Sequence, residues 1–127
     1  MSFDIYQIVE SFSSHRFAVT YPHMADGIKW NIVGREELVG REAVMARCAE
    51  WTKFLETVST TSTKLDIHRA ETWVVVEGAA HFQDRENQTS SVASCDVHQF
   101  SEERLVEITS YVIELNKPQS HSRLLLD

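Results

Sequence analysis

The sequence predicts a single α+β domain in which a strongly bent, mostly antiparallel sheet wraps around N-terminal helices and leaves a cone-shaped pocket. Apolar residues recur at helical spacing near the start of the chain and again over 41–56, whereas the part after residue 57 alternates like strands only. A polar Asn31 also interrupts an apolar strand pattern. The 127 residues fit one domain, which we assign to 1–117, with 118–127 as a C-terminal tail.

The first elements follow from apolar spacing and capping residues. Residues 3–13 carry one apolar face, so we expect a helix there with Ser2 as its N-cap. Residues 16–21 are expected to form a short second helix or a turn that Pro22 limits. Residues 27–33 alternate and are expected to be a strand.

The second half of the chain is expected to form about four long antiparallel strands behind the helix at 41–56. Their patterns occupy residues 57–70, 72–83, 90–100 and 105–115. Gly78, inside the strongest of them, suggests a bulge or bend. With the helices on one face of a curved sheet, this order is typical of an α+β fold.

Charge and cysteine usage exclude several classes of function. The formal net charge is −7, without a cluster of Lys or Arg, so we expect neither a nucleic acid nor a membrane as partner. Residues 1–4 lack the layout of a signal peptide, which favours a cytoplasmic protein. Cys48 and Cys95 stand far apart and are expected to be reduced, buried thiols. The histidine spacing suggests no metal site, and no cofactor is expected.

Three segments of the sequence resemble the SnoaL-like polyketide-cyclase branch of the nuclear-transport-factor-2-like superfamily. Residues 26–31 (DGIKWN) look like its first strand, and residues 40–44 (GREAV) look like the start of its long helix. Residues 96–100 (DVHQF), followed by 105–111 (LVEITSY), look like its last two strands. Glu103-Arg104 departs from the family's usual Gly-Lys, which suggests a different turn. The resemblance implies a pocket for a small, mostly apolar molecule.

Ketosteroid isomerase, a member of the same superfamily, allows a residue-by-residue comparison. Its general-base Asp falls on Asn31, which cannot take a proton at neutral pH. Its oxyanion Tyr falls near Ile8, and its pocket carboxylic acid falls on Asp96. One of three groups survives, so the chain is not expected to be a ketosteroid isomerase.

The resemblance to a cyclase implies an acid/base carboxylate, for which Asp96 is the candidate. Asp96 and His98 stand two residues apart on one strand face, an arrangement suited to an acid/base pair. Parity adds Ser94, and comparison with the family adds part of the last strand. The predicted substrate-binding residues are Trp30, Asn31, Ser94, Ile108, Ser110 and Val112.

Other groupings are weaker candidates. An epoxide-hydrolase arrangement of two carboxylates and an Arg would need Asp66, Arg69 and Asp96. His15 is expected in a solvated loop.

We therefore predict a domain that binds an apolar small molecule and, if it is an enzyme, performs cofactor-free isomerase, cyclase or dehydratase chemistry with Asp96. The alternative is a non-catalytic ligand-binding or protein-interaction module of the same fold. A homodimer is also expected, because a bent sheet leaves an apolar outer face. The residues concerned are Trp73, Val75, Tyr111 and Ile113.

Overall fold

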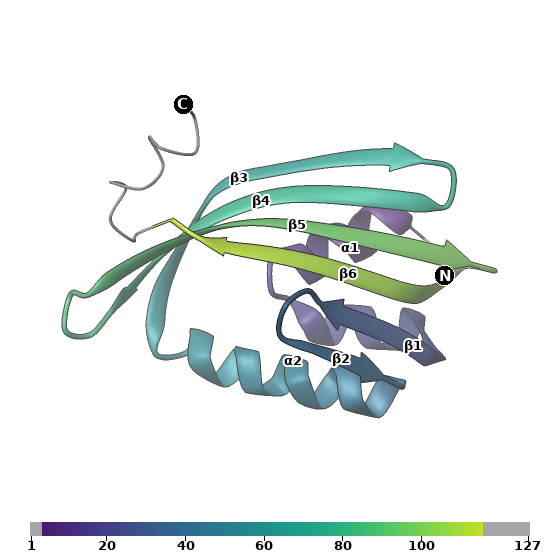
Figure 1. Ribbon diagram of the computed structural model, residues 1–127, viewed down its shortest axis with the longest axis horizontal. Coiled ribbons are helices and arrows are strands. Elements are labelled where there is room, and N and C mark those ends of the chain that lie inside the picture. The colour runs from purple at the N-terminus through teal and green to yellow at the C-terminus, as the bar shows by residue number, and fades with distance from the viewer. Residues whose placement is uncertain (1–3, 116–127) are drawn as a thin grey trace.

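The structure is a computed structural model that describes residues 4–115 (Figure 1). The elements are α1 (Ile5–Ser13), the 3-10 helix η1 (Phe17–His23), β1 (Met24–Ile32), β2 (Glu36–Val39), α2 (Arg41–Leu55), β3 (Val58–Ala70), β4 (Trp73–Asp84), β5 (Thr89–Ser101) and β6 (Arg104–Glu114). The predicted tail at 118–127 and the predicted Ser2 cap lie outside the described residues. Within residues 4–115, no helix has the length and apolar content needed to cross a membrane.

Helix α1 begins later than the sequence pattern suggests. Asp4 is its N-cap, because the Asp4 carboxylate accepts hydrogen bonds from the backbone N–H groups of Tyr6 (3.1 Å) and Gln7 (3.2 Å). The predicted start at residue 3 is therefore wrong by two residues. Pro22 lies inside η1 rather than ending it, since this short helix runs to His23.

The six strands form one sheet in the order β2-β1-β6-β5-β4-β3. The strands β3 to β6 are a continuous antiparallel series, which confirms the prediction for the second half of the chain. Two features were not predicted. Strand β1 pairs with β6 in parallel, and the short strand β2 pairs antiparallel with β1.

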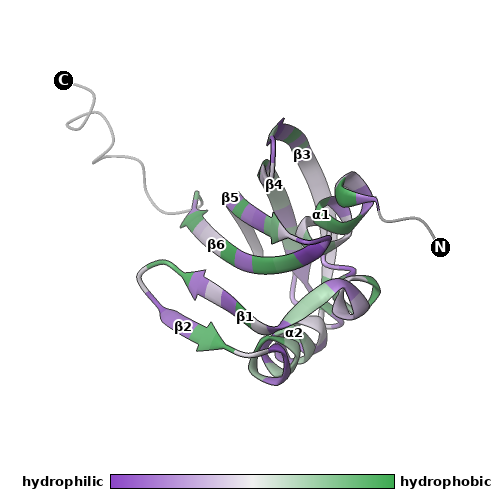
Figure 2. Cartoon of the chain, turned by 90° about the vertical axis from the view of Figure 1, so that its right-hand side faces the viewer, coloured by the Kyte–Doolittle hydropathy of each residue, from purple (hydrophilic) through white to green (hydrophobic). Residues whose placement is uncertain are grey.

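The sheet bends around the helices, as Figure 2 shows, with α1 and α2 on its concave side. Side chains that alternate along the strands place apolar groups on this side, where they pack against α1 and α2. The buried core contains Ile5, Ile8, Val9, Phe12, Phe17, Met24, Ile28, Trp30, Ile32, Val44, Cys48, Val74, Val76, Phe100, Leu105 and Ile108. These residues fill one end of the concave side.

A β-bulge interrupts the pairing of β3 with β4. Ser62 pairs with Ala80 and Lys64 with Ala79, so Thr63 is the extra residue. The expected irregularity therefore lies in β3, across from the small residues of β4, rather than at Gly78.

The β5–β6 hairpin turns through Glu102 and Glu103, which both adopt positive φ (51° and 62°). A turn of this kind favours Gly at the second position, because a Cβ is strained there. We expect Glu103→Gly to raise the free energy of unfolding by about 0.5–1 kcal/mol, measured by urea denaturation. The control Glu86→Gly lies in the β4–β5 turn, where residue 86 shows no positive φ, and should not stabilise the chain. A destabilised Glu103→Gly protein would contradict the expectation.

Candidate functional site

The concave side of the sheet holds a cavity of about 450 Å³, lined from α1, η1, α2 and strands β1, β3, β4, β5 and β6. It forms because side chains on this side become small beyond the core. On β4, Val74 and Val76 fill the core, whereas Gly78 and Ala80 line the cavity. Ser62, which pairs with Ala80, is also small and lines the cavity. The volume lies in the range of small-molecule sites.

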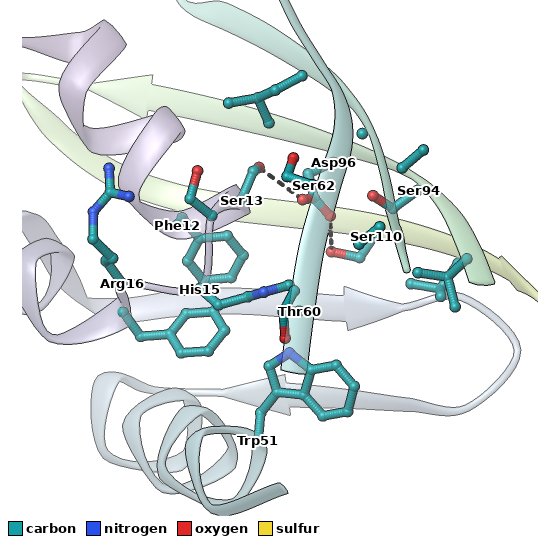
Figure 3. Close-up of a pocket in the computed structure, with 18 of the residues that line it drawn as sticks. Phe12, Ser13, His15, Arg16, Trp51, Thr60, Ser62, Ser94, Asp96 and Ser110 are labelled. Carbon is teal, nitrogen blue, oxygen red and sulfur yellow. Dashed lines mark hydrogen bonds between the residues drawn. The ribbon is translucent and has the colours of Figure 1, made fainter. Parts of the chain in front are cut away.

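Asp96 lies at the inner part of the cavity, where hydroxyl groups hold its carboxylate in place (Figure 3). The Ser13 hydroxyl, at the end of α1, donates to Oδ2 at 2.9 Å. The Ser110 hydroxyl, directly across the β5–β6 ladder, donates to Oδ1 at 2.6 Å. Trp30 Nε1–H in turn donates to Ser110 Oγ at 2.9 Å, which leaves the Ser110 proton free for Asp96. Asp96 is 8% exposed.

His15 enters the cavity from the turn that follows α1. The N–H of His15 donates to the Phe12 carbonyl at 3.0 Å. The N–H of Arg16 donates to the Ser11 carbonyl at 2.8 Å. This pair of bonds is a Schellman C-cap, with His15 at the left-handed position (φ 68°) that is usually Gly. The turn aims the imidazole inward and corrects the expectation of a solvated loop.

The His15 ring lies against aromatic side chains of the cavity. Its centroid is 5.8 Å from that of Phe17, 5.9 Å from Trp51 and 6.5 Å from Phe82. Burial lowers the pKa of His15, and the negative charge of Asp96 opposes this shift. His15 is therefore neutral at pH 7, with one ring nitrogen as donor and the other as acceptor.

Four of the predicted ligand contacts line the same cavity as Asp96. They are Trp30, Ser94, Ser110 and Val112. Polar lining residues that sequence analysis did not identify include Ser13, Ser14, His15, Thr60 and Ser62, together with several basic residues.

Asn31 does not point into the cavity. Its neighbours Trp30 and Ile32 line the cavity, and successive side chains of a strand point to opposite faces. Asn31 therefore lies on the outer face, where it pairs with Glu37 of β2 and Thr109 of β6. The expectation that positions 31 and 96 face one hollow is wrong for this geometric reason.

His98 and Ile108 share the concave face with Asp96, as predicted, but lie in the filled part of it. Both are fully buried and neither lines the cavity. The His98 ring packs edge-on against Phe12, with centroids 5.6 Å apart, and its Nδ1 lies 3.3 Å from the Val74 carbonyl. Nε2 has no hydrogen-bond partner within residues 4–115. Burial lowers the pKa of His98. The negative charge of Asp96 and hydrogen bonds with the backbone of Val74 and Asp96 oppose this shift.

Neutral, buried His98 makes stability depend on pH. The unfolded chain takes up a proton on this residue as the pH falls below about 6.5, whereas the folded chain resists it. The contribution of His98 to the free energy of unfolding is therefore fully present above pH 6.5. It is lost as the pH falls below 6.5 and through the lower pKa of the folded state. Between pH 7 and 5.5, we expect the free energy of unfolding to fall by about 1 kcal/mol less in His98→Leu than in wild type. Urea unfolding at each pH measures this difference. Parallel profiles for the two proteins would contradict this account.

Other sequence candidates do not converge. Asp66 and Arg69 are exposed and lie apart from the cavity, with Lys64 and the Glu71 carbonyl as respective partners. No cluster of three His, Cys, Asp or Glu side chains suited to a metal occurs within residues 4–115. Cys48 is a free, buried thiol whose pKa burial raises to about 12, whereas Cys95 is free and half-buried.

A helix-filled, bent sheet with a cavity at its open end defines the class of cone-shaped α+β pocket folds. No protein-family model and no curated protein matches the sequence significantly. Solved structures do match. An NTF2-like protein of unknown function from Cytophaga hutchinsonii is 30% identical, with a TM-score of 0.75 over 85% of this chain and 95% of that one.

Two further structures share the fold. A putative SnoaL-like polyketide cyclase from Jannaschia sp. is 11% identical (TM-score 0.69, covering 84% of this chain and 83% of that one). An epoxide hydrolase of the LEH-like type from M. tuberculosis is 15% identical (TM-score 0.63, covering 84% and 80%). The chain belongs to the NTF2-like family. The predicted resemblance is confirmed, and for the SnoaL-like branch it is confirmed at the level of the fold.

Proposed function

We propose that this chain binds an apolar small molecule in the cavity and catalyses proton transfer on it with its own side chains. The observation that carries this proposal is the setting of Asp96. It is the single carboxylate among the described cavity-lining residues, it is buried, and two hydroxyls hold its orientation. A carboxylate with a fixed position in an apolar cavity is suited to general acid/base catalysis.

Asp96 retains acceptor capacity for a substrate. A carboxylate has about four lone-pair sites, and Ser13 and Ser110 use one each. The remaining sites can take a proton from a carbon next to a carbonyl group. Thr60, Ser62 and Ser94 supply hydroxyl donors to the cavity wall, where they can bind the carbonyl oxygen as negative charge develops on it (Figure 3).

His15 takes the place that His98 held in the sequence-based prediction. Both are near enough to Asp96 to respond to its charge, but only His15 lines the cavity. As a neutral imidazole it can accept one proton and donate another, so it is the second acid/base group of the proposed site. Solved structures of this fold include a putative cyclase and an epoxide hydrolase, which supports a reaction on a small molecule.

The test is catalysed exchange of α-protons in D2O, followed by NMR on a panel of apolar ketones that includes 2-tetralone. We expect exchange of at least one ketone above the buffer rate, and a reduction in the His15→Asn protein. Asn tolerates the left-handed backbone at this position, so the turn after α1 is kept. Ketones that bind without exchanging above background would contradict the catalytic proposal and leave a binding module.

We further propose a cytoplasmic homodimer that covers the outer face of the sheet. Tyr111 and Ile113 of β6 are 46% and 61% exposed, and Trp73 of β4 is 44% exposed on the same face. We expect wild type to have a dimer mass by light scattering at micromolar concentration and Ile113→Arg to be monomeric, because an unpaired charge would be buried. Val19→Arg, a control on η1 with 49% exposure at that site, should remain a dimer. A monomeric wild type would contradict this proposal.

A further inference from the structure

The cavity carries a charge opposite to that of the whole chain. The chain has 19 acidic and 12 basic residues, with a net charge of −7. Three arginines are instead among the described cavity-lining residues, whereas Asp96 is the single carboxylate among them. The three are Arg16, Arg35 and Arg47. Lys64 also borders the cavity, but its ammonium group lies 3.8 Å from Asp66 and 4.0 Å from Glu77, which do not line it. A cleft lined with one sign of charge concentrates ligands of the other sign, so this cavity attracts anions although the protein as a whole repels them.

The negatively and positively charged side chains lie at different depths in the cavity. Asp96 is buried, whereas Arg16 and Arg35 are exposed cavity-lining residues and therefore lie at its mouth. The Arg47 side chain is 25% exposed. An anionic group is thus repelled from the inner end and attracted at the opening. A ligand with an acid at one end can enter in one direction only.

Arg35 is the cation most available to a ligand. Arg16 pairs with Glu10 at 3.5 Å, and Arg47 pairs with Glu36 at 3.0 Å and lies 3.8 Å from Glu50. Arg35, by contrast, has no ion pair within residues 4–115. It lies in the turn between β1 and β2, where its N–H donates to the Ile32 carbonyl at 2.9 Å.

Arg47 supports Arg35 from helix α2. Its Nε donates to Glu36 Oε2 at 3.0 Å, and Glu36 is the residue next to Arg35. This bond brings α2 and the β1–β2 turn together at the mouth. Glu50 lies 3.8 Å from Nη1 of Arg47. Because a guanidinium group has five N–H donors, the Nη2 group of Arg47 keeps its donors for a ligand acid.

We propose that the ligand of this cavity is an amphipathic organic acid, whose apolar body lies among Trp51, Phe82 and His15 and whose anionic group is bound by Arg35 and Arg47. The proposal rests on the proposed binding of a small molecule in the cavity, but it does not depend on catalysis. It names the ligand class, which the apolar lining alone leaves open.

Two dyes with one skeleton test this directly. N-phenyl-1-naphthylamine is neutral, and 8-anilinonaphthalene-1-sulfonate adds one negative charge; both fluoresce when they enter an apolar site. We expect wild type to bind the sulfonate at least threefold more tightly, and added salt to weaken the sulfonate alone. Arg35→Gln should weaken the sulfonate about five- to tenfold and leave the neutral dye within twofold. The double variant with Arg47→Gln should weaken the sulfonate further.

The control Arg85→Gln removes the same charge from the exposed β4–β5 turn, outside the cavity. It should leave both affinities unchanged. Ala80→Trp places a ring inside the cavity. Dye fluorescence that persists in this variant therefore comes from binding on the outer face of the sheet. Equal or weaker binding of the sulfonate, with no effect of Arg35→Gln, would overturn the organic-acid proposal alone. A wild type that binds neither dye would overturn the proposed function itself. Equal loss of both dyes in Arg35→Gln would assign that residue a structural role and also overturn the proposal.

Discussion

Replacing Asp96 with Asn will slow α-proton exchange of a bound ketone by at least about 100-fold, the typical contribution of a general acid/base group. The amide fills nearly the same space but cannot take up the proton. The single amide oxygen can still accept a hydrogen bond from one of the two hydroxyls, that of Ser13 or that of Ser110. The initial rate of deuterium incorporation by NMR, at saturating ketone, measures the effect.

Two controls separate chemistry from folding and charge. Asp96→Asn should bind N-phenyl-1-naphthylamine within about threefold of wild type, because the aromatic lining is unchanged. Asp66→Asn removes an equal charge from the exposed surface of β3, outside the cavity, and should exchange at the wild-type rate. An Asp96→Asn protein with the wild-type exchange rate would remove Asp96 from the reaction.

Replacing Ala80 with Trp will weaken ligand binding roughly 100-fold. Ala80 lies on the concave side of β4 at the edge of the cavity, so an indole ring there occupies the space of a ligand. Excluding about 120 Å² of apolar ligand surface costs about 3 kcal/mol, which lowers affinity by roughly 100-fold. Fluorescence titration with N-phenyl-1-naphthylamine measures the loss.

The matched control is Ala49→Trp, on the exposed side of α2, which should bind the dye like wild type. Thermal unfolding and circular dichroism establish that both variants are folded. A folded Ala80→Trp protein with unchanged affinity would show that the dye binds elsewhere, for instance on the apolar outer face of the sheet.

The long elements of this fold follow from local patterns, because apolar periods of 3.6 and 2 residues are visible over ten or more positions. Strands β3 to β6 and helix α2 were predictable for that reason. Strand β2 has four residues, Glu36–Val39, with no alternation of buried and exposed positions. The parallel pairing of β1 with β6 joins segments about 80 residues apart. Neither leaves a local pattern in the sequence.

The face of the sheet that carries the candidate site was predictable, but the extent of the cavity along that face was not. Alternation on β5 placed Ser94, Asp96 and His98 on one face, and the structure agrees. It could not show that the cavity ends at Asp96, since that depends on Phe12 packing over His98. The same alternation, applied strictly, places Asn31 and Trp30 on opposite faces of the sheet, because successive side chains of a strand point to opposite faces.

His15 could not be found from spacing, because its position depends on a turn that usually contains Gly. A His in place of that Gly, directly after an amphipathic helix, is a signal in retrospect. The small residues Gly78 and Ala80 are another, since small side chains on the concave side leave room for a cavity. Both signals become informative only when the curvature of the sheet is known.

A crystal structure with the most tightly bound ketone of the panel tests the central claim most directly. The account predicts density for the ligand inside the cavity, with its rings against His15 and Trp51 and its reactive carbon or oxygen within hydrogen-bond reach of the Asp96 carboxylate. A ligand on the outer face, or one inside the cavity with Asp96 turned away from it, would contradict the account.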